Sequence, residues 1–415
     1  MLIYNVFLYV FFIPLSVILV FISIFNSRIR KTLKYRFFIN IKKSDEKRVW
    51  FHCSSLGEFN AIKNVILKVE KKIPNIFITV LTDTGYEAAV KLFGKERVAI
   101  LPLDLKFLIK RLIKRINPAI LIIEETELWP NMIYQANKQD IPIIYANAII
   151  SDRSFKSYKK FAFIFAKVIK SIELFFVQNK TTAEYLKYFG IREERIKYIG
   201  NVKFDIKLDF DKDPEELKKI YYLEENKILT CGSIREGEEE ILIKAFGVIK
   251  KKLSNIKLIM VPRHLDRIQD IIKIIERYSL GYSLLSELKK AYDILIVDKM
   301  GVLLDFYAVS DISFIGGTMV PIGGHNPLEA AVFGKPVIFG KYIKNNEQAF
   351  LELSKNNAGI MVHNEAELTD MLIKLFKESR LRESMGRNAV LVMEKNRGAA
   401  DKIAEVILNK VIGKV

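Results

Sequence analysis

The chain has few cysteines and histidines for its 415 residues. Its two cysteines, Cys53 and Cys231, cannot form a disulfide framework, and so small a number fits a reducing compartment. Its four histidines include no i,i+4 pair on one expected helix and no histidine beside a cysteine cluster. We therefore expect no metal site.

Several chemical and binding motifs are absent as well. The sequence has no Gly-x-Ser-x-Gly elbow and no Walker loop. His52 and Cys53 are adjacent on an expected strand, so they point to opposite faces and do not form a nucleophile–base pair. The formal charge of +18 points to an anionic partner, but the sequence has no nucleic-acid module. We therefore expect a phosphorylated ligand or a membrane surface, and no nucleic acid.

The N-terminal segment is long and apolar. Residues 2–25 carry no charge, and roughly 20 apolar residues are enough to span a bilayer. Pro14 lies in the middle of the segment, so a monotopic hairpin or interfacial anchor is the alternative. Basic residues follow the segment, and the positive-inside rule therefore places the rest of the chain in the cytoplasm. We predict a membrane anchor at residues 1–27 and a basic juxtamembrane segment at 28–48 that lies against anionic lipid.

From residue 49 onward, short β-rich runs alternate with helical periodicity, which predicts an α/β protein with mostly parallel, doubly wound sheets. The expected strands cover residues 49–53, 76–81, 98–101, 119–123, 142–146 and 174–177, and then 228–231, 257–261, 294–297, 312–315, 336–339 and 359–362. We predict Rossmann-like domains at 49–205 and 226–415 with the active site in the cleft between them, joined by a linker at 206–225. In that linker Asp213 and Pro214 are typical of a helix start. The last helix, residues 400–412, belongs to the second domain or crosses back to the first.

Glu58 lies where the first strand gives way to a helix. Ligands bind at the carboxyl ends of parallel strands, and the N–H groups and dipole of a helix start favour an ionised carboxylate. Glu58 is therefore placed to act as a base. The alternative is an ordinary glutamate that stabilises the first turn of its own helix.

Charged residues also gather at two other places in the first domain. Glu124, Glu125 and Glu127 end a very apolar strand, where mutual repulsion is costly, so we expect a function or a basic partner. Lys203 lies at the domain junction, and its alternative role is an ion pair with Asp205 or a plain surface charge.

The second domain carries a glycine-rich strand–helix connection at residues 316–329. Paired glycines let backbone approach a ligand, and a helix that begins near Asn326 and Pro327 would offer N–H groups to a phosphate. Glu329 can accept hydrogen bonds from ribose hydroxyls. The alternative is a plain strand–turn–helix connection with a capping asparagine and an N1 proline.

Three further strand ends supply candidates in this domain. Ser233 follows one strand, and the glutamates at 236 and 238–240 after it are expected to form an exposed, acidic helix start. Arg263 ends another strand, where it can bind a phosphate or carboxylate in bidentate fashion or simply be a surface arginine. Residues 300–302 form a loop whose backbone can contact a base.

Five of these stretches together resemble the Kdo transferases of lipopolysaccharide assembly, which are glycosyltransferases of GT-B architecture. They are residues 50–58, 125–131, 200–205, 262–264 and 323–329, in the order that the family has them. The resemblance implies transfer of the acidic sugar Kdo from CMP-Kdo to a lipid A precursor at the inner membrane, with inversion and without a cofactor.

The resemblance also implies roles for single residues. Glu58 would be the general base, and Glu125 and Lys203 would stabilise the transition state. Ser55 and Gly57 would leave room for the acceptor sugar. The residues implied to bind or support the CMP donor are Pro262, Arg263, Met300, Gly301, Val302, Asn326, Pro327, Leu328 and Glu329, with Ser233, Gly317 and His325 beside them.

The chain departs from the family pattern at two points. Ser233-Ile234-Arg235 replaces the usual Ser-Thr-His, and Gly301-Val302-Leu303 replaces the usual Gly-Glu-Leu, which removes a carboxylate from the nucleotide loop. Two alternatives therefore stand beside Kdo transfer. One is a GT-B-type transferase for another nucleotide sugar, or a sugar-nucleotide epimerase. The other is a non-catalytic, membrane-anchored nucleotide-binding protein.

Overall fold

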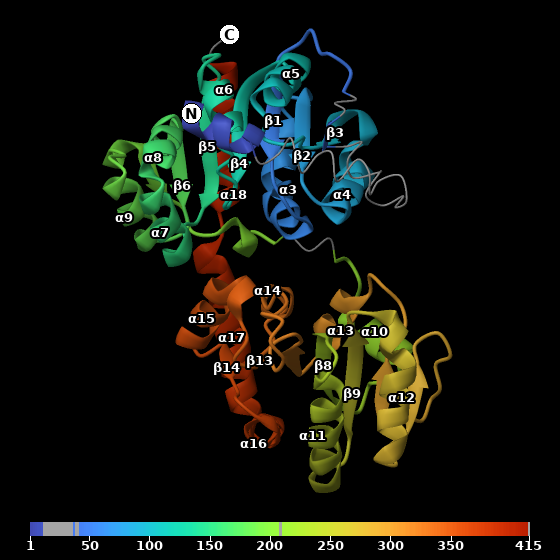
Figure 1. Ribbon diagram of the computed structural model, residues 1–415. Helices are drawn as coiled ribbons and strands as arrows, with labels where there is room; N and C mark the ends of the chain where they lie inside the picture. Colours follow the sequence, from blue (N-terminus) through green and yellow to red (C-terminus); the bar gives the residue numbers. More distant parts are fainter. Residues whose placement is uncertain (11–35, 38–40, 207–209, 414–415) are drawn as a thin grey trace. The chain divides into compact units, whose positions relative to one another are not determined.

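The computed structural model describes residues 1–10, 36–37, 41–206 and 210–413. The chain divides into two compact units (Figure 1). The first unit comprises Met1–Asp205 together with Arg397–Val415, and the second comprises Ile206–Asn396. The C-terminal residues therefore return to the unit in which the chain begins.

The first unit is built on a parallel sheet of seven strands in the order β3-β2-β1-β4-β5-β6-β7. The strands are β1 (Arg48–His52), β2 (Ile76–Val80), β3 (Val98–Ile100), β4 (Pro118–Glu124), β5 (Ile143–Ala148), β6 (Leu174–Val177) and β7 (Ile196–Tyr198). The central strands are buried on both faces, which is why their sequences read as continuous apolar runs.

Helices cover both faces of this sheet. One face packs against α3 (Leu56–Glu70), α4 (Asp83–Phe93) and α18 (Ala399–Ile412). The other packs against α5 (Lys106–Ile116), α6 (Pro130–Asn137), α8 (Ala162–Lys170) and α9 (Lys180–Tyr188), and α7 (Asp152–Lys160) precedes α8. Asp205 fixes the start of α18, because its two carboxylate oxygens accept the N–H groups of Gly398 and Ala400 at 2.6 Å each.

The second unit repeats the plan with a parallel sheet in the order β10-β11-β9-β8-β12-β13-β14. Its strands are β8 (Lys227–Ile234), β9 (Ile256–Pro262), β10 (Tyr282–Leu284), β11 (Ile294–Ile296), β12 (Ile312–Ile315), β13 (Val337–Phe339) and β14 (Gly359–Met361). One face packs against α11 (Glu238–Lys252), α12 (Ile268–Arg277) and α16 (Glu365–Lys377), and the other against α10 (Pro214–Ile220) and α13 (Leu303–Val309). The remaining helices are α14 (Leu328–Ala331), α15 (Glu347–Lys355) and α17 (Ser379–Asn396).

The two doubly wound parallel sheets confirm the predicted α/β class. The predicted helix start at Asp213 is also confirmed, since its side chain accepts the N–H of Glu215 and Pro214 is the first helical residue. Two strands were not predicted, β7 and β10, because each is short and has only one buried residue, which leaves no apolar run in the sequence.

The predicted anchor lies mostly outside the described residues, because the structure describes only residues 1–10 of it. Residues 2–10 are helical. Tyr4 donates its hydroxyl proton to Asp104 at 2.9 Å, and Asn131 donates to Asn5 at 2.9 Å, while Leu2, Ile3, Val6, Phe7 and Val10 are exposed. In the part of the chain that the structure describes, no helix has the length and apolar character needed to cross a membrane.

Candidate active site

Polar side chains of the first unit collect at the carboxyl ends of neighbouring parallel strands. Glu58 follows β1, three glutamates follow or end β4, and Asn147 ends β5. Because β1, β4 and β5 are adjacent in the sheet, these groups share one edge, which is where ligands bind in such folds.

Glu58 is held by the loop that precedes its helix. Ser55 is the N-cap of α3, and its Oγ accepts the N–H of Glu58 at 3.3 Å. The Glu58 carboxylate in turn accepts the N–H of Ser54 at 2.6 Å and the Ser54 hydroxyl at 2.5 Å. Ser54 and Ser55 therefore fix the rotamer of Glu58 before any substrate arrives. Glycine is not required at position 57, because its φ is not positive and an added Cβ would meet only Ser55 Oγ at 3.7 Å.

Burial changes the acidity of Glu58 more than the helix start does. The residue is only 8% exposed, and this desolvation raises the pKa of Glu58 to about 7. The bonds from Ser54 lower the pKa in part, while the charges of Glu127 and Glu125 raise it further. The sequence predicts that backbone N–H groups and the helix dipole favour the ionised form, but the effect of burial on the pKa is larger than that of the bonds from Ser54. A carboxylate with a pKa near neutrality is a much stronger base than an exposed one.

Glu125 and Lys203 face each other in the same unit. Lys203 Nζ donates to Glu125 Oε1 at 3.0 Å, and both side chains are about four-fifths buried. Glu125 adopts a left-handed backbone conformation with φ of 57°, which is unfavourable for a residue with a Cβ. The ion pair of Lys203 with Asp205, considered from the sequence, does not form, because Asp205 caps α18 instead.

A buried amide network, which the sequence analysis missed, positions Lys203. Asn147 Nδ2 donates to Glu124 Oε1 at 2.8 Å, and Asn147 Oδ1 accepts the N–H of Val202 at 3.2 Å. Asn201 donates to Gln178 at 3.0 Å, and its Oδ1 accepts the N–H of Lys203 at 2.9 Å. The short 3₁₀ turn Val202–Phe204 is thereby tied to the ends of β4, β5 and β6. The sequence did carry one signal of this network, because Asn147 is a polar residue near the end of a buried strand, at the same edge of the sheet as Glu124.

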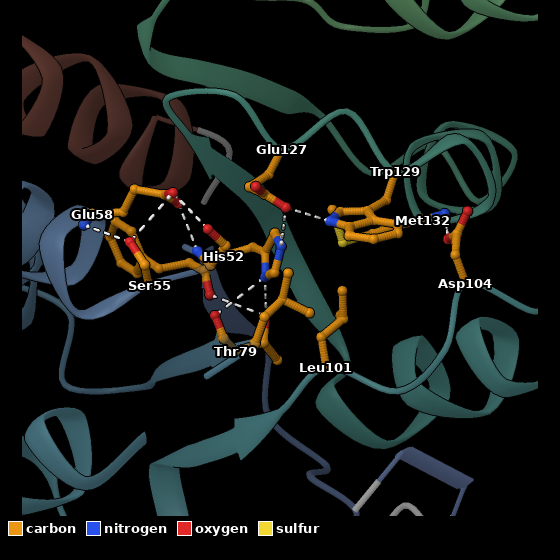
Figure 2. A network of polar contacts seen from close by, with 12 residues as sticks. His52, Ser55, Glu58, Thr79, Leu101, Asp104, Glu127, Trp129 and Met132 are labelled. Carbon is orange, nitrogen blue, oxygen red and sulfur yellow. Dashed lines mark hydrogen bonds and ion pairs between the residues drawn. The ribbon is translucent and has the colours of Figure 1, made fainter. Parts of the chain in front are cut away.

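Glu127 belongs to a second network beside Glu58. Its Oε2 accepts the indole N–H of Trp129 at 2.6 Å and lies 4.0 Å from His52 Nε2 (Figure 2). Burial lowers the pKa of His52 to about 3, so this histidine is neutral and makes no ion pair with Glu127. His52 Nδ1 lies 2.9 Å from Thr79 Oγ1, which makes it a packed core histidine.

In the second unit, the loop after β12 approaches its neighbours closely. Gly316 has no room for a side chain, because an added Cβ would lie 2.3 Å from the carbonyl oxygen of Ser233. Gly317 has φ of 73° and packs against His325, whose N–H donates to the Gly316 carbonyl at 3.1 Å. Ser233 itself has φ of 57°. The first predicted glycine pair, Gly316 and Gly317, is therefore required by the backbone.

Glu238 holds this loop in place, which corrects a prediction. The glutamates after Ser233 were expected to be exposed, but Glu238 and Glu239 are buried. The Glu238 carboxylate accepts four backbone N–H groups, from Arg235 at 2.9 Å, Gly317 at 2.7 Å, Thr318 at 3.0 Å and Met319 at 2.9 Å. Burial raises the pKa of Glu238, and these four donors partly offset the effect.

The other predicted donor residues lie at strand ends and loops of the same unit. Arg263 directly follows β9, which ends at Pro262, and its side chain is exposed. Met300 is exposed beside Gly301, whose φ is 87°, and Val302 precedes α13. Asn326 Oδ1 accepts the N–H of Leu328 at 3.1 Å, and α14 begins at Leu328 with Pro327 as its N-cap rather than as its first helical residue; Glu329 lies in its first turn. Helix α14 has only four residues.

Across the residues that the structure describes, no group of three or more His, Cys, Asp or Glu side chains could hold a metal ion. The groups that the structure brings to this edge of the sheet are carboxylates, a lysine and backbone N–H groups.

Comparison with known proteins identifies relatives of the whole chain. Residues 31–206 match the family model of 3-deoxy-D-manno-octulosonic-acid transferase. The chain is 31% identical over 401 residues to the 3-deoxy-D-manno-octulosonic acid transferase of Haemophilus influenzae, which covers 93% of each protein. It is 38% identical over 372 residues to a bifunctional glycosyltransferase/methyltransferase of Fusobacterium nucleatum. That match covers 85% of this chain but only 57% of the bifunctional protein.

A more distant likeness concerns the fold alone. The UDP-GlcNAc 2-epimerase of Neisseria meningitidis, solved with UDP-GlcNAc, superposes with a TM-score of 0.62 at 14% identity, covering 88% of this chain and 100% of the epimerase. The chain, whose two units each contain a parallel seven-stranded sheet, therefore has a GT-B-like fold. Sequence similarity along nearly its full length shows that the chain belongs to the Kdo transferase family and is a glycosyltransferase.

Proposed function

We propose that this chain is an inverting glycosyltransferase that moves Kdo from CMP-Kdo to a sugar hydroxyl of a lipid A precursor at the cytoplasmic face of the inner membrane. The observation that carries the proposal is the buried Glu58 carboxylate, with a pKa of about 7, in a chain of this family. Glu125 and Lys203 lie in the same unit and add a carboxylate and an ammonium group to the site.

Glu58 is the general base. It takes the proton from the acceptor hydroxyl while the hydroxyl oxygen attacks the anomeric carbon of Kdo, and the bond from that carbon to the CMP phosphate oxygen breaks. CMP leaves with the bonding electrons, and because the acceptor oxygen attacks the anomeric carbon directly, no covalent enzyme intermediate forms. Positive charge develops on the sugar in such transition states, and a carboxylate such as Glu125 stabilises it. Lys203 offsets the negative charge of the departing phosphate.

The second unit holds the donor. Arg263 at the end of β9 offers a guanidinium that suits a phosphate or carboxylate. The loop of Met300, Gly301 and Val302 offers backbone groups to cytosine, and Glu329 offers a carboxylate to ribose hydroxyls. The apolar segment at residues 2–25 would keep the enzyme beside its lipid acceptor.

The proposal is tested by incubating the full-length protein in detergent with CMP-Kdo and a lipid A precursor. We expect the lipid to gain the mass of Kdo while an equal amount of CMP is released. UDP-GlcNAc in place of CMP-Kdo serves as the control for a different transferase or an epimerase. Transfer or epimerisation with UDP-GlcNAc, and no lipid product with CMP-Kdo, would refute the assignment.

A further inference from the structure

The second unit contains a cluster of four basic side chains: Arg235, Arg263, His264 and His325. Arg235 directly follows β8, Arg263 and His264 follow β9, and His325 lies in the loop after β12. Since β9, β8 and β12 are neighbours in the sheet, the cluster occupies the carboxyl edge of three adjacent parallel strands. By the resemblance to the family pattern described above, Arg235 replaces the histidine of a Ser-Thr-His motif.

Two imidazoles hold the Arg235 guanidinium in one orientation. Its Nε donates to His325 Nε2 at 3.0 Å, and its Nη1 lies 2.6 Å from His264 Nε2. A guanidinium can only donate, so both Nε2 atoms accept and both rings carry their proton on Nδ1. For His325 this state is favoured because burial, followed by the nearby positive charges, lowers its pKa to about 4. The two imidazoles thus orient the Arg235 side chain without neutralising its charge.

The two carboxylates nearest in sequence, Glu236 and Glu238, bond to groups other than the Arg235 guanidinium. Glu236 pairs with Arg267 at 3.4 Å. The Glu238 carboxylate accepts the backbone N–H of Arg235 and three more backbone N–H groups of the loop. Burial and then the charge of Arg263 lower the pKa of Arg235, and the charge of Glu238 offsets this only in part. Two guanidiniums collected at a ligand-binding edge are stabilised by an anion that bonds to both.

We propose that Arg235 is a specificity-determining residue that, together with Arg263, clamps an anionic group of the sugar-nucleotide donor, with His264 and His325 as its positioning residues. The ligand group is a phosphate or a carboxylate, and an activated acidic sugar carries both. Two of the five N–H donors of Arg235 are directed at imidazoles, which leaves the Nη2 side of the fork for the anion. This inference rests on the donor site proposed above.

The test compares the binding of cytidine, CMP and CMP-Kdo to the full-length protein by calorimetry. Arg235→Gln should weaken CMP binding about 10- to 100-fold while leaving cytidine unchanged, since a charge-assisted bond is lost. If the clamped group is the sugar carboxylate, Arg235→Gln should leave the affinity for CMP unchanged and weaken the binding of CMP-Kdo by the same factor. Arg235→Lys keeps the positive charge but loses the bidentate geometry of the guanidinium, so its affinity for the ligand should lie between those of wild type and Arg235→Gln.

Arg267→Gln is the matched control. This arginine lies in the next turn of the same region but already pairs with Glu239 at 3.4 Å and Asp270 at 2.8 Å. The Arg267→Gln variant removes the same charge as Arg235→Gln, and we expect it to bind cytidine, CMP and CMP-Kdo with the wild-type affinities. The clamp is overturned if Arg235→Gln binds CMP and CMP-Kdo as wild type does, or if Arg267→Gln weakens them equally. If the wild-type protein binds UMP more tightly than CMP, the proposed donor is wrong. The clamp would then be tested by whether Arg235→Gln weakens the binding of UMP but not of uridine.

Discussion

Replacement of Glu238 by glutamine should destabilise the second unit and disturb its donor loop. The two oxygens of Glu238 each accept two backbone N–H groups, and Oε2 serves Arg235 and Gly317. Glutamine supplies one oxygen and one NH₂ group, so two buried N–H donors lose their acceptor. Each unsatisfied buried donor costs about 1–3 kcal/mol, which gives a total of about 2–6 kcal/mol.

Urea unfolding followed by far-UV circular dichroism measures this change. Both tryptophans, Trp50 and Trp129, lie in the first unit, so tryptophan fluorescence reports that unit separately. We expect Glu238→Gln to lower the unfolding free energy seen by circular dichroism and to weaken CMP binding. Glu240→Gln is the control, because Glu240 is half exposed and its ion pair with Arg277 at 3.4 Å is worth less than about 1 kcal/mol. A loss below about 1 kcal/mol for Glu238→Gln would refute the reasoning.

Two further predictions concern the first unit. Because burial raises the pKa of Glu58 to about 7 and a base must be ionised, kcat/KM should fall tenfold per pH unit below pH 7 and level off above it; a flat profile from pH 5 to 8 would contradict this. Asp205→Ala removes the acceptor of the Gly398 and Ala400 N–H groups and should cost about 2 kcal/mol, with faster amide exchange in α18. Asp401→Ala, at an exposed position in the same helix, should change stability by less than about 0.5 kcal/mol.

Much of the architecture could be predicted because parallel strands buried on both faces leave a strong signal. The apolar runs at β1, β4 and β9 are continuous, and the helices between them show helical periodicity. The edge strands β7 and β10 leave no such signal. The pattern of β7 is one buried residue followed by two exposed ones, which does not differ from a loop.

The site was only partly predictable, because long-range contacts decide the state of several residues. Glu238 has the sequence context of an exposed helix start, yet a loop some 80 residues later buries it and bonds to it. The environment of Arg235 depends on His264 and His325, which are 29 and 90 residues away. For Glu58, the strand–helix junction was visible in the sequence, but the degree of burial that raises its pKa was not.

The most direct test of the central claim is the rate of Kdo transfer to a lipid A precursor by Glu58→Gln at pH 8, measured from the lipid mass. Loss of a general base should reduce kcat about 10²- to 10⁴-fold. Glu70→Gln, at the other end of the same helix and paired with Arg97, should retain the wild-type rate. Transfer by Glu58→Gln at the wild-type rate would contradict the account.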